Sequence, residues 1–148
     1  MRSLLTILTL ILISVSDAVG ASPEDEAKKL FERYVDSERT FDPAVSELYS
    51  DDAKIQNKRT YLDGSTRVSM MPAPKYKELI RATMPLAKAR GDTNQYSEVK
   101  YVSEGQKVRI TATRFSNLKK YSSPISLLVG PSPEGKWLIF EELSESKP

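Results

Sequence analysis

The second half of the chain alternates apolar and polar side chains with a period of two, and this pattern constrains the fold more than any other feature of the sequence. Successive side chains of a β-strand point to opposite faces, so a period of two predicts strands. Turn residues such as glycine and proline separate the alternating segments. The predicted strands cover residues 96–103, 106–116, 124–129 and 136–143. Because short turns join them, we expect a four-stranded meander.

The alternation assigns the side chains of this meander to two faces. One face is apolar: Val108, Ile110, Ala112, Ile125, Leu127, Val129, Trp137 and Ile139. The other is mixed: Arg109, Thr111, Thr113, Phe115, Ser126, Leu128, Leu138, Phe140 and Glu142. Half-buried antiparallel sheets usually turn their apolar face toward the core. In that orientation the core is mostly filled and only a small cavity remains.

The first half of the chain has helical spacing instead. Apolar side chains at i, i+3, i+4, i+7 and i+8 predict a helix: Ala27, Leu30, Phe31, Tyr34 and Val35. Ser22 is suited to cap its start. A short second helix is expected to begin at Pro43. A third is expected from Pro74, and Pro85 is expected to end or kink it.

A hairpin is predicted between the second and third helices. Residues 53–60 and 65–71 have strand character, and an Asp-Gly pair lies between them. Helices gathered at one side of an antiparallel sheet define the α+β class. No internal repeat or linker divides the chain, so we expect residues 21–148 to form one domain.

The first twenty residues have the layout of an export signal. Arg2 precedes an apolar run over 4–15, and small residues follow over 16–21. The run is shorter than the roughly 20 residues that cross a bilayer as a helix. We therefore expect residues 1–20 to be a cleaved signal peptide, a periplasmic or secreted mature protein, and no stable membrane anchor after cleavage. A retained N-terminal anchor is the alternative.

The composition excludes several chemistries. The chain has no cysteine and no histidine, which removes disulfides, thiol catalysis and Ser-His-Asp nucleophiles. A zinc site would need carboxylates alone, an unusual ligand set, so we expect neither a metal nor a cofactor. The net charge of +2 gives no electrostatic case for nucleic acid.

Three short segments and the order of the elements resemble the nuclear transport factor 2-like superfamily. The segments are Phe-Glu-Arg-Tyr-Val at 31–35, Leu-Tyr-Ser-Asp-Asp-Ala at 48–53 and Gly-Lys-Trp-Leu-Ile at 135–139. The resemblance implies a curved antiparallel or mixed sheet that wraps a long N-terminal helix, with two further helices, and encloses a cone-shaped pocket. The superfamily includes isomerases, dehydratases, cyclases and non-catalytic binding modules, so this resemblance predicts no single chemistry.

The steroid isomerase branch of that superfamily provides a test. Its mechanism uses a carboxylate base and an oxyanion hole made of a tyrosine and a protonated aspartic acid. Tyr34 matches the tyrosine. Asn57 stands at the position of the base, and Ser126 stands at the position of the aspartic acid. Since two of the three groups are missing, the resemblance does not carry the activity over.

The same resemblance implies that the mixed face lines the cone. Ser126, Phe140 and Phe115 would then lie inside, with Arg109, Thr111 and Thr113 as polar walls. The apolar face would be exposed and would require a partner, most simply a second copy in a homodimer through the sheet face. A dimer in solution therefore favours this orientation, and a monomer favours the filled core. Tyr34, Tyr49 and Asn57 from the first half of the chain complete the predicted set of ligand-binding residues. The set is Tyr34, Tyr49, Asn57, Arg109, Thr111, Thr113, Phe115, Ser126 and Phe140.

Three functions remain open from the sequence. The leading hypothesis is an exported non-catalytic domain that binds a small molecule, or a protein or peptide, in its cone. The second is an isomerase or lyase that uses Tyr34 and a buried carboxylate such as Glu98 or Glu142. The third is a structural or interaction domain whose cone is filled. Arg114 is expected to extend to the surface.

Overall fold

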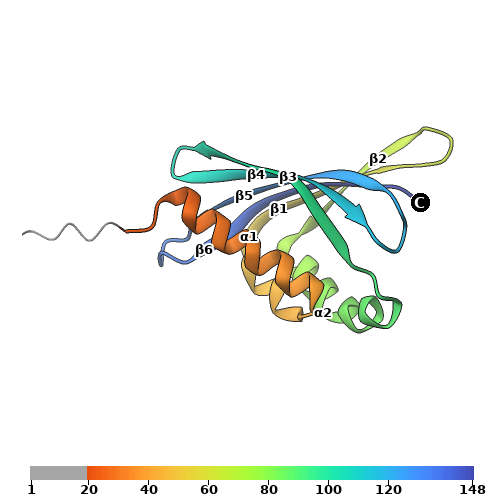
Figure 1. The fold of residues 1–148 in the computed structure, drawn as a ribbon, viewed down its shortest axis with the longest axis horizontal. Helices are drawn as coiled ribbons and strands as arrows, with labels where there is room; N and C mark the ends of the chain where they lie inside the picture. The colour runs from red at the N-terminus through yellow and green to blue at the C-terminus, as the bar shows by residue number, and fades with distance from the viewer. Residues whose placement is uncertain (1–19) are drawn as a thin grey trace, which may run out of the picture.

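The helices lie together on one side of the sheet (Figure 1). A computed structural model describes residues 20–148, so the predicted signal peptide lies outside the described residues apart from Gly20. Helix α1 covers Pro23–Arg39, the 3₁₀ helix η1 covers Pro43–Leu48, and α2 covers Ala73–Arg90. Ser22 caps α1 as expected, because its hydroxyl accepts from the amide of Asp25 in a capping box.

The sheet has six strands in the order β2-β1-β6-β5-β4-β3. The strands are β1 (Tyr49–Thr60), β2 (Thr66–Pro72), β3 (Asn94–Glu104), β4 (Lys107–Ser116), β5 (Ser122–Pro131) and β6 (Trp137–Ser146). The last four form the predicted antiparallel meander. Strand β1 pairs with β2 antiparallel and with β6 parallel, so the sheet is mixed. The predicted α+β fold class is confirmed.

The apolar face of the meander covers the helices. Its side chains are buried with those of α1 and η1 in one core cluster, which includes Val108, Ile110, Leu127, Val129 and Ile139. Helix α1 contacts β3, β4, β5 and β6, and α2 contacts η1, β1 and β2. The alternative orientation, with the mixed face inside, is therefore wrong for this chain. Burial of the apolar side chains outweighs the register implied by the resemblance.

Two β-bulges change which residues point inward. In β6, Leu128 pairs with Glu141 but Val129 pairs with Ile139, so Phe140 is an extra residue. This insertion turns Glu142 toward the core, where it is 2% exposed. In β3, an extra residue between Ser97 and Lys100 coincides with a positive φ of 53° at Glu98. A bulge shifts the alternation of the residues that follow it.

The sequence suggested that Pro85 ends or kinks α2, and the helix does not end there. It continues to Arg90 and ends at Gly91, whose φ of 62° is the left-handed conformation typical of a helix terminus. Within residues 20–148, no helix combines the length and apolar character needed to cross a bilayer.

Candidate functional site

The interior of the cone contains two cavities, and Tyr76 of α2 lines both. The first, about 190 Å³, lies among α1, α2 and the start of β1, with Tyr34, Glu38 and Tyr49 in its wall. The second, about 290 Å³, lies between α2 and the inner face of strands β2, β1, β6 and β4, with Asn57, Arg114 and Glu142 in its wall. The core is therefore not completely filled.

Glu142 is the centre of the polar groups around the second cavity. The hydroxyl of Tyr49 donates a hydrogen bond to Glu142 Oε2, and the hydroxyl of Tyr76 donates to Glu142 Oε1 over 3.2 Å. The rings of Tyr49 and Tyr76 meet edge to face, with centroids 5.4 Å apart. A buried carboxyl is thus held by two tyrosines from different elements, and both of its oxygens have partners.

Glu38 makes a similar arrangement at the first cavity. The hydroxyl of Tyr96 donates to Glu38 Oε2, and Asn94 Nδ2 donates to the same oxygen over 3.4 Å. The Tyr96 ring packs edge to face on Tyr34, with centroids 6.1 Å apart. Tyr34, Glu38, Tyr49, Tyr76, Tyr96, Arg114 and Glu142 form one group, which we call the tyrosine–carboxylate cluster.

Burial changes the proton affinity of this cluster. It raises the pKa of Glu142 above its usual range, against the hydrogen bond from Tyr49, and likewise raises that of Glu38 against the one from Tyr96. Burial acts to lower the pKa of Arg114, but the surrounding acidic groups outweigh it and raise that pKa. The pKa of each cluster tyrosine, Tyr49 among them, is well above normal, mainly through burial. Glu38 and Glu142 therefore bind their protons more tightly than a solvated carboxyl does.

Arg114 is part of this interior, and its expected surface position is wrong. Its Nη2 donates to the backbone oxygen of Glu145 over 3.1 Å, and its side chain lines the second cavity. Alternation had in fact continued the inward series Val108, Ile110 and Ala112 to this position. The guanidinium offsets the charge of any carboxylate that ionises nearby.

The predicted ligand-binding set separates into two groups. Tyr34, Tyr49 and Asn57 lie inside the cone, and Asn57 donates to Ser144 Oγ over 3.0 Å and accepts from Ser146 Oγ over 2.8 Å. Their binding of a ligand stays a prediction. The remaining six lie on the face away from the helices, so their expected place inside the cone is corrected: Arg109, Thr111, Thr113, Phe115, Ser126 and Phe140.

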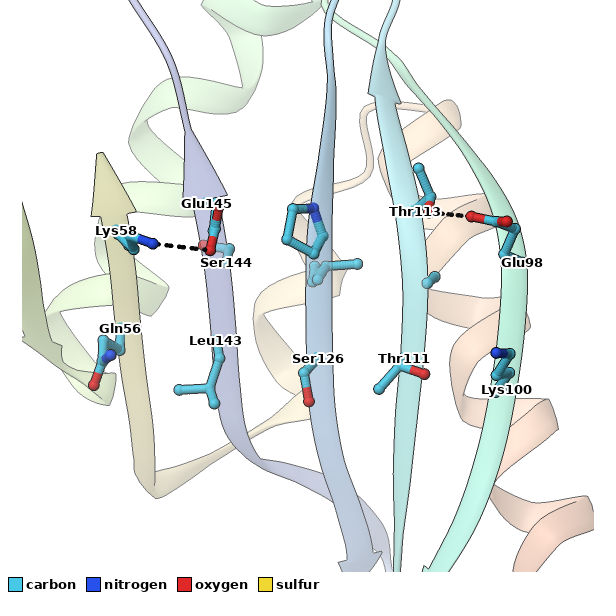
Figure 2. Close-up of a pocket in the computed structure, with 13 residues that line it drawn as sticks. Gln56, Lys58, Glu98, Lys100, Thr111, Thr113, Ser126, Leu143, Ser144 and Glu145 are labelled. Atoms are coloured by element: carbon cyan, nitrogen blue, oxygen red, sulfur yellow. Dashed lines mark hydrogen bonds and ion pairs between the residues drawn. The ribbon is translucent and has the colours of Figure 1, made fainter. Parts of the chain in front are cut away.

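The outer face of the sheet carries a groove of about 510 Å³, which is larger than either cone cavity. Figure 2 shows its polar side chains in front of the sheet with the helices behind it. Thr113 Oγ1 donates to Glu98 over 2.7 Å, and Lys58 lies 3.6 Å from Glu145. Among these groove residues, those that carry charge are mostly exposed.

Arg109 and Phe140 lie beside this groove and already have partners. Arg109 pairs with Glu104 over 2.6 Å and with Glu141 over 2.9 Å. Lys107 Nζ lies 4.3 Å from the centroid of the Phe140 ring. The tyrosine–carboxylate cluster, with its buried titratable groups, is therefore the stronger candidate site.

Sequence reasoning missed most of the cluster. Glu142 had been named only as one carboxylate among others, and Glu38, Tyr76 and Tyr96 were not proposed as site residues. Tyr76, Ile80 and Met84 recur at intervals of four residues, which is typical of one packed helix face, but no pattern in the sequence marks the β6 bulge. Among residues 20–148, no group of three or more acidic side chains is gathered as metal ligands would be.

Comparison with known proteins identifies the fold. No protein-family model matches the sequence, and no curated protein matches it. Solved structures do match, and those similar to this chain include nuclear transport factor 2-like proteins. The chain therefore has the nuclear transport factor 2-like fold, as its resemblance implied.

Three of these structures show how far the likeness extends. The yeast UBP3-associated protein BRE5 is 16% identical with a TM-score of 0.64, over 84% of this chain and 96% of that one. A protein of unknown function from Pseudomonas putida is 12% identical with a TM-score of 0.63, over 83% and 85%. A protein from Shewanella frigidimarina described as a candidate ketosteroid isomerase is 14% identical with a TM-score of 0.61, over 82% and 96%. At such identities the likeness concerns the fold alone.

Proposed function

We propose that this domain binds a small molecule with an apolar body and a hydrogen-bonding head inside the cone. The observation that carries the proposal is the position of Glu142, a carboxyl buried to 2% exposure in the wall of a cavity of about 290 Å³. A ligand head at this carboxyl could accept its proton or donate to it. The apolar part of the ligand would contact Ile55, Met71 and Leu79 on the same wall.

The size of the cavities favours a small molecule over a peptide. Ligand pockets usually measure about 300–1,000 Å³, and each cone cavity is at or below the lower end of that range. Because Tyr76 lines both cavities, a rotation of its side chain would join them. The proposal therefore includes movement of Tyr76 when a larger ligand enters.

A fragment screen by NMR tests the proposal. The probes are small aromatic compounds with one hydroxyl, amide or amine group, such as 2-naphthol. We expect chemical-shift changes at Asn57, Tyr76 and Glu142. We expect at least tenfold weaker binding in Glu142→Gln, because the amide cannot give a proton to the ligand head and form the charged hydrogen bond, which contributes about 1.5–3 kcal/mol. Glu145→Gln, on the same strand but facing outward, is the matched control. Changes confined to the outer groove, or equal binding by both variants, would contradict the proposal.

The same carboxyl supports a second candidate function, an isomerase or lyase. A carboxyl whose pKa is raised by burial is, once ionised, a stronger base than a solvated carboxylate, and Tyr49 and Tyr76 are placed to hydrogen-bond an oxygen that gains charge. Asn57 cannot serve as the base. A β,γ-unsaturated ketone is a suitable substrate probe: conjugation measured by ultraviolet absorbance should be lost in Glu142→Gln and kept in Glu145→Gln. Absence of turnover in the unmodified protein would leave the binding function and exclude this reaction.

Export is part of the proposal and rests on the N-terminal sequence. The order of Arg2, an apolar run and small residues is typical of a cleaved signal. Expression of the full chain with analysis of the mature mass would show loss of about twenty residues and recovery outside the cytoplasm. An uncleaved chain would support the retained anchor instead.

A further inference from the structure

The β1–β2 hairpin carries both exposed apolar side chains and basic side chains. Its tip extends away from the helices and the rest of the sheet (Figure 1), and β2 is an edge strand. Half of the exposed large apolar side chains of residues 20–148 lie on it: Tyr61, Leu62, Val68 and Met70. Leu62 is 94% exposed and Met70 is 67% exposed. Exposed apolar residues gathered in this way mark an interaction surface.

The charge of the hairpin is as unusual as its apolar content. Residues 54–72 contain four basic residues and one acidic residue, which gives this segment a charge of +3 against +2 for the whole chain. Arg59 and Arg67 face each other directly across the strands. Like charges in that position destabilise a hairpin, and no ion pair to either arginine occurs among the described side chains. An external anion would remove this repulsion.

Hydrogen bonds within the turn use the hairpin's one acidic residue, Asp63. Asp63 Oδ1 accepts from the amide of Ser65 over 2.9 Å and from its hydroxyl over 2.6 Å. Two backbone bonds close the turn, from Tyr61 N to Ser65 O and from Gly64 N to Tyr61 O. Leu62 therefore lies at the tip of a hydrogen-bonded turn, and the guanidinium of Arg59 lies 5.7 Å from the Tyr61 ring centroid.

We infer that this hairpin docks on an anionic phospholipid surface. Leu62 and Tyr61 enter the boundary between headgroups and acyl chains, where an aromatic ring with a hydroxyl is favourable. Arg59 and Arg67 then lie at the level of the lipid phosphates, and this charge complementarity selects an anionic lipid over a neutral one. The contact is peripheral and reversible, because one short apolar tip cannot anchor a protein. The inference is independent of the ligand site in the cone.

Vesicle co-sedimentation of residues 21–148 tests the inference. The vesicles contain phosphatidylglycerol and phosphatidylcholine at 30:70, or phosphatidylcholine alone. We expect binding to the anionic vesicles that weakens at high salt, and at least tenfold weaker binding to the neutral ones. Arg59→Glu with Arg67→Glu should reduce binding at least 25-fold, since each basic residue near the surface contributes about fivefold. Leu62→Ser should reduce it about tenfold through lost apolar burial.

A matched control separates the hairpin from overall charge. Arg33→Glu with Lys136→Glu makes the same charge change at exposed positions on α1 and the β5–β6 turn, and α1 does not contact the hairpin. This variant should keep most of the binding, and all variants should keep the wild-type circular dichroism and Tm. Equal loss in both charge variants would overturn the inference. So would wild-type protein that ignores anionic vesicles but binds a polyglutamate peptide through Arg59 and Arg67, which would assign the hairpin to an acidic protein.

Discussion

The two faces of the sheet both carry charged and hydroxyl side chains, but their surroundings differ. On the outer face, Lys58 and Glu98 meet partners at the protein surface, where water screens the interaction. On the inner face, Glu142 is enclosed and bound by Tyr49 and Tyr76. Ion pairs and hydrogen bonds at the surface contribute little to stability. Burial of a carboxyl, in contrast, raises its pKa. The difference explains why the larger outer groove is the weaker candidate site.

Adjacent leucines on opposite faces give the largest expected contrast. Leu127 is 1% exposed in the core, whereas Leu128 is half-buried on the outer face. Leu127→Ala should lower the free energy of unfolding by about 3 kcal/mol, through lost burial and the cavity left behind. Leu128→Ala should lower it by about 1 kcal/mol. Urea unfolding measures both, and equal losses would contradict the assignment of the apolar face to the core.

The pH dependence of stability gives the next contrast, starting with Glu142. Because burial raises its pKa above 4.5 in the folded protein, the folded state binds this proton more tightly than the unfolded state does. The stability from that proton is present below pH 4.5 and is lost as the pH rises through the raised pKa. The glutamine side chain of Glu142→Gln cannot ionise. The free energy of unfolding of this variant should therefore rise relative to that of the wild type between pH 4.5 and pH 7.

Glu104 on the outer side should show the opposite sign. The hydrogen bond from Arg109 lowers the pKa of Glu104 below 4.5, so its contribution is present above pH 4.5 and is lost as the pH falls. The disadvantage of Glu104→Gln relative to wild type should therefore shrink in acid. Parallel denaturation series at several pH values measure both slopes. Slopes of the same sign would show that Glu142 is not enclosed as described.

The order and type of the elements could be predicted from the sequence because periodicity reports directly on burial. The apolar series ending at Val129 and Ile139 predicted the inner face of the meander, and the spacing of Leu30, Phe31 and Tyr34 predicted α1. Orienting the sheet by the resemblance instead moved Arg109 and Ser126 to the wrong face. Local physical chemistry was the better guide to packing.

The candidate site was harder to predict because it depends on strand pairing. The bulge at Phe140 turns Glu142 inward. The residue types of β6 do not reveal where a bulge occurs, so the sequence did not predict this orientation. Tyr96 and Glu38 come from elements far apart in sequence and meet only in the folded chain. Pro85 shows the reverse case, because α2 continues past this residue to Arg90 although proline normally breaks or kinks a helix.

The β3 bulge gives the smallest expected effect and tests the outer face at one residue. Glu98 has a φ of 53°, a conformation that costs a residue with a Cβ about 1–2 kcal/mol and glycine almost nothing. Glu98→Gly loses the bond from Thr113 but relieves this strain, so the free energy of unfolding should change by less than about 0.5 kcal/mol. Ser97→Gly, on the preceding residue without a positive φ, should lower it by about 0.5–1 kcal/mol. Thermal and urea denaturation of both variants would measure the difference. A loss in Glu98→Gly as large as that in Ser97→Gly would mean that the bulge is not strained and that the Thr113 contact, not the backbone, holds Glu98 in place.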